Sequence, residues 1–335
     1  IIENEELVDL NQFLHKEINL NLKSKGYFYP ELNKTLSFNK YIFTESKLVT
    51  QSNYEINDIN STLYTNIDNK ISGIFSSEIP DQKIRGSILS DNQNITLRSK
   101  VVIDMNDTFN YGQYLHFSGI QEFSTKMNIN DTVSLEFTSN LENTSIKSNI
   151  DNLRKEIGSY LKTTILVSDL SQPTYYVENK KFKAFIDNDN NGYFSLGSGF
   201  NNELKKIKTN NGFYIFLELD ELSFDTLFSE NQLETNTNLK LIKLKIDKLK
   251  FFDNTYLDQY FEINFLANET YANFSGKNLN GSMKIDSSGF IRVDVFDTKF
   301  EFRGLNSLNS NNTALINNIN LNYQNRNVII LLITT

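Results

Sequence analysis

The sequence predicts a mainly β protein: an elongated antiparallel sheet built of repeated strand layers, with one or two short helices. Two observations carry this prediction. Apolar and polar residues alternate through most of the 335 residues, and one strand phrase occurs twice. Alternation places every second side chain on the same face of a sheet. The only prolines are Pro30, Pro80 and Pro173, which leaves long stretches without a strand breaker.

The repeated phrase reads apolar-x-apolar-Asp-x-Leu-x-Phe. It occupies residues 217–224 and again residues 244–251, and a degraded third copy occupies residues 293–300. In each copy the alternation skips one position after the Asp. Such a skip turns the following side chains to the other face unless the strand bulges or breaks there. We therefore expect a bend near Asp220 and near Asp247.

The first strands are predicted around residues 71–75, 95–103 and 133–137, where apolar and polar residues alternate. Later segments alternate in the same way, and their charged or amide neighbours point to the other face. A sheet with one apolar face and one solvent-exposed polar face is typical of antiparallel meanders. The apolar positions of the later segments are Ile215, Leu217, Leu219, Ile242, Leu244, Ile246, Phe261, Ile263, Phe265, Met283, Ile285, Ile291, Val293 and Val295.

Helical spacing occurs in one part of the chain. Leu153, Ile157, Tyr160 and Leu161 recur at helical spacing, which predicts a helix over residues 151–162 with Asp151 as its N-cap. A second short helical turn is predicted at residues 225–228. Both are minor elements on a β framework.

The composition limits the possible functions. Hydrophobic residues make up 39% of the chain, below the usual globular share, although 26 Phe and 16 Tyr are present. Such a chain can bury a thin apolar layer, as in a single sheet or a shallow groove. The net charge of -8, with lysines scattered beside acids, argues against nucleic-acid binding. The absence of Cys excludes disulfides, and only 2 His disfavour a multi-histidine metal site.

The chain begins with Ile1 and ends on an apolar run at residues 328–333, which predicts a piece of a longer protein. The run is far shorter than the ~20 residues of a membrane helix, so we predict no spanning segment in this piece. We predict one continuous β assembly over residues 1–335, with approximate sub-regions 1–200 and 201–335.

No motif predicts catalysis or a cofactor. Asp187, Asp189, Asn191 and Gly192 match the first half of a calcium loop, but Ser198 stands where that loop needs a bidentate Glu. A polar hairpin turn is the simpler interpretation. Phosphate-binding loops, nucleophile elbows and zinc-protease motifs are absent from the sequence. We therefore expect a protein that is not an enzyme and holds neither cofactor nor metal.

The apolar face has two interpretations that alternation alone does not separate. It can be the core of a sandwich closed by a second sheet, as in a structural or adhesive repeat protein of the cell surface. Alternatively, it can line a groove whose apolar surface is covered by a ligand.

The order of the strand phrases resembles that of the AsmA-like superfamily, in particular its large YhdP-type members from Gram-negative bacteria. Residues 117–141 resemble the family's Gly-containing strand and the small-polar-Leu phrase that follows it. Residues 213–228 resemble a strand ending in Leu-Asp-x-aromatic, with Phe224 where the family often has Trp. Residues 244–285 and 291–302 resemble the later strands and a hairpin. The resemblance covers roughly residues 110–303, without the family's Trp residues or its Pro-rich stretch.

This resemblance implies a U-shaped sheet with a hydrophobic groove, in a protein anchored at the inner membrane and crossing the periplasm. It implies a bridge-like protein that carries phospholipid acyl chains between the inner and outer membranes and serves outer-membrane biogenesis. The fourteen apolar positions given above would then line the groove. Phospholipid would be the partner, together with both membranes through parts of the chain not present in this sequence.

Overall fold

A computed structural model gives the fold. It describes residues 17–19, 22–27, 38–49, 55–66, 70–79, 82–91, 94–108, 110–111, 115–130, 132–148, 150–169, 172–207, 212–223, 238–251, 254–267, 269–277, 279–288, 290–296, 298–301, 313–316 and 319–324.

The fold is mainly β and predominantly antiparallel, with very little helix, which confirms the predicted fold class. The helical elements in the described part are α2 (Met105–Thr108), α3 (Asn201–Leu204) and the 3-10 turn η3 (Asp151–Leu153). The chain divides into two compact units. Unit 1 comprises Ile1–Asn110, Phe117–Ser145 and Glu156–Val177, and unit 2 comprises Tyr111–His116, Ile146–Lys155 and Glu178–Thr335.

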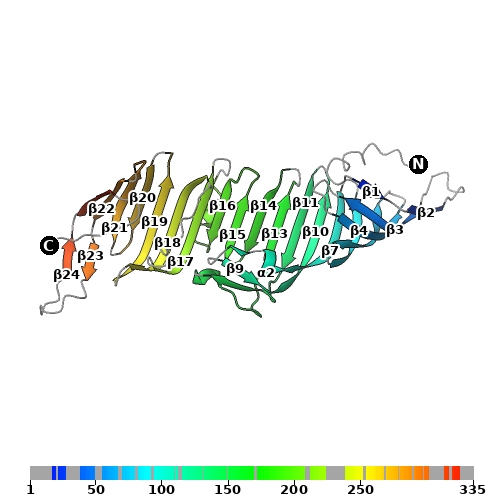
Figure 1. The fold of residues 1–335 in the computed structure, drawn as a ribbon, viewed down its shortest axis with the longest axis horizontal. Coiled ribbons are helices and arrows are strands. Elements are labelled where there is room, and N and C mark those ends of the chain that lie inside the picture. Colours follow the sequence, from blue (N-terminus) through cyan, green and yellow to red (C-terminus); the bar gives the residue numbers. More distant parts are fainter. Residues whose placement is uncertain are drawn as a thin grey trace. The chain divides into compact units, whose positions relative to one another are not determined.

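Unit 1 contains an antiparallel meander in which β3 to β7 pair in chain order and β7 then pairs with β10, β10 with β11 and β11 with β13 (Figure 1). Strands β1 and β2 both pair with β3. The strands are β1 (Glu17–Asn19), β2 (Leu22–Tyr27), β3 (Phe38–Val49), β4 (Glu55–Thr65), β5 (Ile71–Ile79), β6 (Gln82–Asp91), β7 (Asn94–Asp104), β10 (Ile120–Ile129), β11 (Val133–Ser139) and β13 (Thr163–Ser168).

Unit 2 contains a second series of paired strands, from β15 through β22 to β25 (Figure 1). The strands are β15 (Phe182–Ile186), β16 (Gly192–Leu196), β17 (Phe213–Ser223), β18 (Leu239–Phe251), β19 (Asn254–Phe265), β20 (Glu269–Ser275), β21 (Asn280–Asp286), β22 (Phe290–Phe296) and β25 (Ile319–Gln324). The remaining strands are β8 (Asn110–Tyr111), β9 (Leu115–Ser118), β12 (Ser145–Ser148), β14 (Thr174–Asn179) and the separate pair β23 (Thr298–Glu301) and β24 (Thr313–Ile316).

The two full copies of the repeated phrase lie in β17 and β18, which pair in parallel. Leu217 is opposite Leu244 and Leu219 is opposite Ile246, so equivalent positions of the two copies are neighbours. Strand β16 is also parallel to β17. These two pairs depart from the antiparallel pattern. A parallel pair needs a long crossover, and residues 197–212, which include α3, supply one.

The burial pattern changes phase at the skip in the repeated phrase, where the sequence predicts a bend. Asp220 and Asp247 are exposed, while Leu249, three positions after Ile246, is buried in the same cluster as Ile246. In the next strand Asp258 adopts a left-handed backbone with φ of 50°. Apolar residues on both sides of the skip therefore contact the same core.

Two local predictions are wrong. Residues 151–162 do not form a helix: only residues 151–153 form a 3-10 turn, and Arg154 is already extended. Ile157 and Tyr160 are exposed, whereas Leu161 is buried. The second predicted helical turn, at residues 225–228, lies outside the described residues.

Candidate apolar binding face

Apolar side chains of unit 2 stand opposite one another across successive strands. Ile215 pairs with Ile242, which in turn pairs with Ile263, and the same line continues through β20, β21 and β22. Paired residues share a face of the sheet. We call this line the open row; its members are Phe194, Ile215, Ile242, Ile263, Ala272, Met283 and Val293.

The open row is only partly protected from solvent. Apart from the small Ala272, which is buried, its side chains are half-buried, and Phe194 at one end of the row packs against a buried cluster that includes Leu219. Phe265 and Ile285 lie beside it, since both face Thr270 of β20, and they are also half-buried. Half-buried apolar side chains in adjacent strands form a surface that a ligand can cover.

A neighbouring part of the same face is covered by the protein itself. Leu219, Ile246, Leu249 and Tyr256 are almost fully buried in one cluster together with Leu153 from η3. We call this group the covered cluster. Burial alone raises the pKa of Tyr256 to about 12, because the phenolate is poorly solvated there.

Polar contacts hold the covering segment, residues 146–155, in place. The ammonium of Lys181 donates to the carbonyls of Asn152 and Arg154, at 3.0 and 2.5 Å. Ile146 and Lys155 exchange backbone hydrogen bonds. These contacts fix the segment, which contains the end of β12 and the turn η3, over the sheet face.

The predicted lining residues therefore occupy three environments. Leu219 and Ile246 belong to the covered cluster, and Leu217, Leu244 and Phe261 are partly buried against it. Val295 is buried. Ile291 pairs with Ile285, but its side chain lies outside the described part of the structure. The others lie in or beside the open row: Ile215, Ile242, Ile263, Phe265, Met283, Ile285 and Val293.

A second apolar row, in unit 1, was not among the predicted lining residues. It crosses seven strands from β4 to β13, with a glycine at its β5 position, and the side chains of its other members are half-buried. Alternation is the signal that could have found it, because the strand predictions at residues 95–103 and 133–137 already contain two of its members. The row is Leu63, Gly73, Ile88, Leu97, Met127, Leu135 and Val167.

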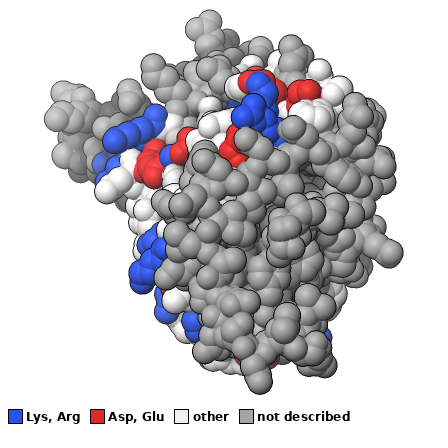
Figure 2. All heavy atoms as spheres, turned by 90° about the vertical axis from the view of Figure 1, so that its left-hand side faces the viewer, with Lys and Arg blue, Asp and Glu red and all other residues white. Residues whose placement is uncertain are grey.

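The opposite face of unit 2 carries paired charges. Lys243 lies 2.7 Å from Glu203 and 3.3 Å from Glu262, and Lys245 lies 2.9 Å from Glu218. Burial opposes the charge of Lys243, but hydrogen bonds to Glu203 and Tyr260 outweigh it and raise the pKa of Lys243. We call these three pairs the charge ladder. Figure 2 shows that acidic and basic side chains also adjoin one another at the top of that view.

Glu218 of the charge ladder also holds the start of the crossover after β16. Its carboxylate accepts the backbone N–H groups of Ser198 and Gly199 at 3.0 and 2.8 Å. The hydrogen bond from Lys245 is the main cause that lowers the pKa of Glu218, and these backbone donors add to it. Farther along the crossover, the ring of Phe200 packs on that of Phe216 at 5.4 Å.

The described residues contain no group of three or more His, Cys, Asp or Glu side chains that could hold a metal ion. The candidate calcium loop is a hairpin turn between β15 and β16. Its Asp187 carboxylate accepts the backbone N–H groups of Asp189 and Asn191 at 2.9 and 2.8 Å. Among the helices of the described residues, none is long and apolar enough to span a membrane.

Comparisons of this chain with protein-family models, with curated proteins and with solved structures found no match.

Proposed function

We propose that this chain is a segment of a bridge-like lipid-transfer protein that holds phospholipid acyl chains on its apolar face. In this proposal the protein works in the periplasm, between the inner and outer membranes, and is not an enzyme. The observation that carries the proposal is the open row: apolar side chains in register across seven strands, all of them except Ala272 only half-buried.

The dimensions of the open row suit an acyl chain. Neighbouring strands are about 4.8 Å apart, so the row extends for about 29 Å. The acyl chain of one bilayer leaflet spans about 15 Å, half of the hydrocarbon core. One chain laid along the row therefore crosses about three strands, and a lipid could move along the row without leaving an apolar surface.

The energetics also favour a lipid ligand. Each CH₂ of an acyl chain that is removed from water contributes about 0.8 kcal/mol to the binding free energy. The half-buried side chains of the row lose exposed apolar surface in the same contact, which adds to that free energy. The charge ladder on the opposite face keeps that side hydrated. Lipid would therefore bind to one face only, and its head group would remain at the solvated border.

One observation favours a second candidate function, a structural or adhesive repeat protein with a closed core. The covered cluster shows that part of this face is closed by the chain itself, with Leu153 packed over Leu219 and Ile246. In a closed-core protein another segment or partner would cover the open row in the same manner.

Site-specific photo-crosslinking separates the two candidates. A benzophenone amino acid at Ile263, in the open row, is expected to capture phospholipid in cells. The matched control is the same amino acid at Asn273, an exposed residue of the adjacent strand that pairs with Glu262 on the opposite face.

Lipid adducts at Ile263 and not at Asn273 would support the proposal. Adducts to protein alone at Ile263 would support the closed-core alternative. Equal lipid capture at both positions would show non-specific contact and contradict a one-sided lipid track.

A further inference from the structure

The face of unit 1 opposite its apolar row contains a hollow of about 550 Å³. Ser87, Arg98, Lys126 and Glu136 follow one another across β6, β7, β10 and β11 as directly paired residues. Arg85 lies two positions before Ser87 and so shares its face. The hollow is lined by Arg85, Gly86, Ser87, Arg98, Ser99, Lys100, Ser124, Thr125, Lys126, Glu136 and Thr138.

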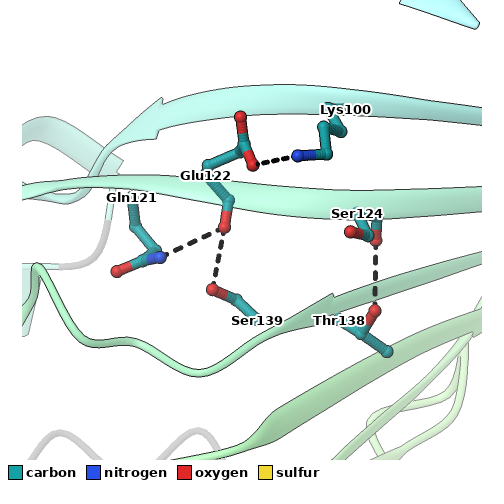
Figure 3. A network of polar contacts seen from close by, with 6 residues as sticks. All are labelled: Lys100, Gln121, Glu122, Ser124, Thr138 and Ser139. Carbon is teal, nitrogen blue, oxygen red and sulfur yellow. Dashed lines mark hydrogen bonds and ion pairs between the residues drawn. The ribbon is translucent and has the colours of Figure 1, made fainter. Parts of the chain in front are cut away.

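Within the described part of the chain, three of the four basic side chains in this hollow lack the acidic partners that Lys243 and Lys245 have in the charge ladder. Lys100 pairs with Glu122 at 2.7 Å (Figure 3). Among the described residues, Arg85, Arg98 and Lys126 form no ion pair within 4.0 Å. Lys126 stands directly opposite Glu136 without pairing with it.

Arg98 and Lys126 are themselves direct cross-strand partners. Like charges in that position repel and destabilise a sheet. In the charge ladder, by contrast, Lys243 and Lys245 each face a Glu. Arg85, Arg98 and Lys126 together outnumber the single carboxylate of Glu136 in this hollow, so an anion between Arg98 and Lys126 would offset their repulsion.

Hydroxyl groups stand beside these cations. Ser124 is paired with both Lys100 and Thr138, so both hydroxyls lie on the basic face. The Thr138 hydroxyl donates to the Ser124 carbonyl at 3.4 Å, a long hydrogen bond (Figure 3). Guanidinium groups bind phosphate oxygens through two parallel hydrogen bonds, and hydroxyl groups can donate further bonds.

We propose that this hollow binds the phosphate group of a soluble phosphate ester. Arg98 and Lys126 would contact the phosphate oxygens, and Arg85 would add a third positive charge. Ile74, which pairs with Ser87 and is 67% exposed, offers an apolar contact to the organic part of the ester. The apolar row of unit 1 lies on the other face of the same sheet, so the phosphate of a lipid bound to that row would not reach this hollow. The inference is independent of the proposed function.

The test is a titration of the purified chain with glycerol phosphate by isothermal calorimetry at constant ionic strength. Binding is expected for the unmodified chain and is expected to weaken about tenfold or more in Arg98→Gln, because a charge-assisted hydrogen bond is lost. Lys245→Gln, in the charge ladder, is the matched control and should bind as the unmodified chain does. Circular dichroism checks that each variant is folded.

A second readout is thermal unfolding. Glycerol phosphate should raise the Tm of the unmodified chain and not that of the Arg85→Gln/Arg98→Gln variant. Equal binding by the unmodified chain and this double variant would overturn the proposal. Binding to vesicles of phosphatidylglycerol without binding to glycerol phosphate would also overturn it, since the surface would then recognise a lipid membrane.

Discussion

At the scale of single residues, Glu218 links three parts of unit 2. Its carboxylate binds Lys245 of the neighbouring strand and two backbone N–H groups at the start of the crossover. Gly197 adjoins it with φ of 84°, and a Cβ there would lie 2.6 Å from the Glu218 side chain. This close approach explains why a glycine stands at position 197, at the start of the crossover.

Glu218→Gln is expected to lower the free energy of unfolding by about 1 kcal/mol at neutral pH, because the partly exposed carboxylate loses charge-assisted bonds. The folded state lowers the pKa of Glu218. Its contribution is therefore present above the unfolded value of about 4.3 and disappears as the pH falls through the folded pKa.

Urea unfolding between pH 7 and pH 3 measures this effect. The difference between the unmodified chain and Glu218→Gln should shrink toward acid. Glu78→Gln, at an exposed position of unit 1, serves as the control. A difference that stays constant down to pH 3 would contradict the role given to the Glu218 charge.

The structural role of Gly281 could not be predicted from the Asn-Gly pair to which it belongs. Asn-Gly is a strong hairpin signal, yet both residues lie inside β21. A Cβ on Gly281 would lie 2.5 Å from the ring of Phe274, its cross-strand partner. The backbone carbonyl of Asp294, on the other neighbouring strand, would be closer still, at 2.3 Å. Both neighbouring strands, and not the local sequence, therefore require a glycine here.

At the scale of elements, the covering segment is the main departure from the predicted structure. The predicted helix over residues 151–162 would place Leu153 and Ile157 on the same face. In the structure Leu153 packs in the covered cluster, whereas Ile157 is 64% exposed. The spacing is coincidental, because tertiary contacts and the extended Arg154 determine the path of the chain.

Leu153→Ala is expected to destabilise the protein by about 2–3 kcal/mol, because it opens a cavity above the covered cluster. Ile157→Ala should change stability by less than about 0.5 kcal/mol. Chemical denaturation of both variants tests this contrast. Equal losses would indicate that residues 151–162 pack as the predicted helix.

The parallel pairing of β17 and β18 was also missed, and the repeated phrase held a clue to it. Two copies of one phrase can align residue by residue only when their strands run in the same direction. In the structure Leu217, Glu218 and Leu219 face Leu244, Lys245 and Ile246. Local alternation is the same for both strand directions, so it could not distinguish them.

At the scale of the whole molecule, the strand content and the division into apolar and wet faces were predictable, because alternation is local. The strands around Ile215, Ile242 and Ile263 and their shared face follow directly from it. Which apolar residues stay open was not predictable. Leu219 and Ile246 alternate in the same way, yet a distant segment covers them.

Native mass spectrometry of the purified protein tests the proposed function at this scale. The chain is expected to retain phospholipid, and its removal with detergent is expected to cause self-association through the open row. A protein that carries no lipid and remains monomeric would contradict the proposal and favour the closed-core alternative.

The pairing of β3 to β7 in chain order has a consequence for how such a sheet can change in evolution. Each of these strands contacts mainly its neighbours, so stability is close to a sum over adjacent pairs, as in repeat proteins. Insertion of one hairpin between β5 and β6 would lengthen the array by about 10 Å and leave the other pairings intact. Duplication of hairpins could therefore change the length of the apolar row without changing the sequence of any existing strand.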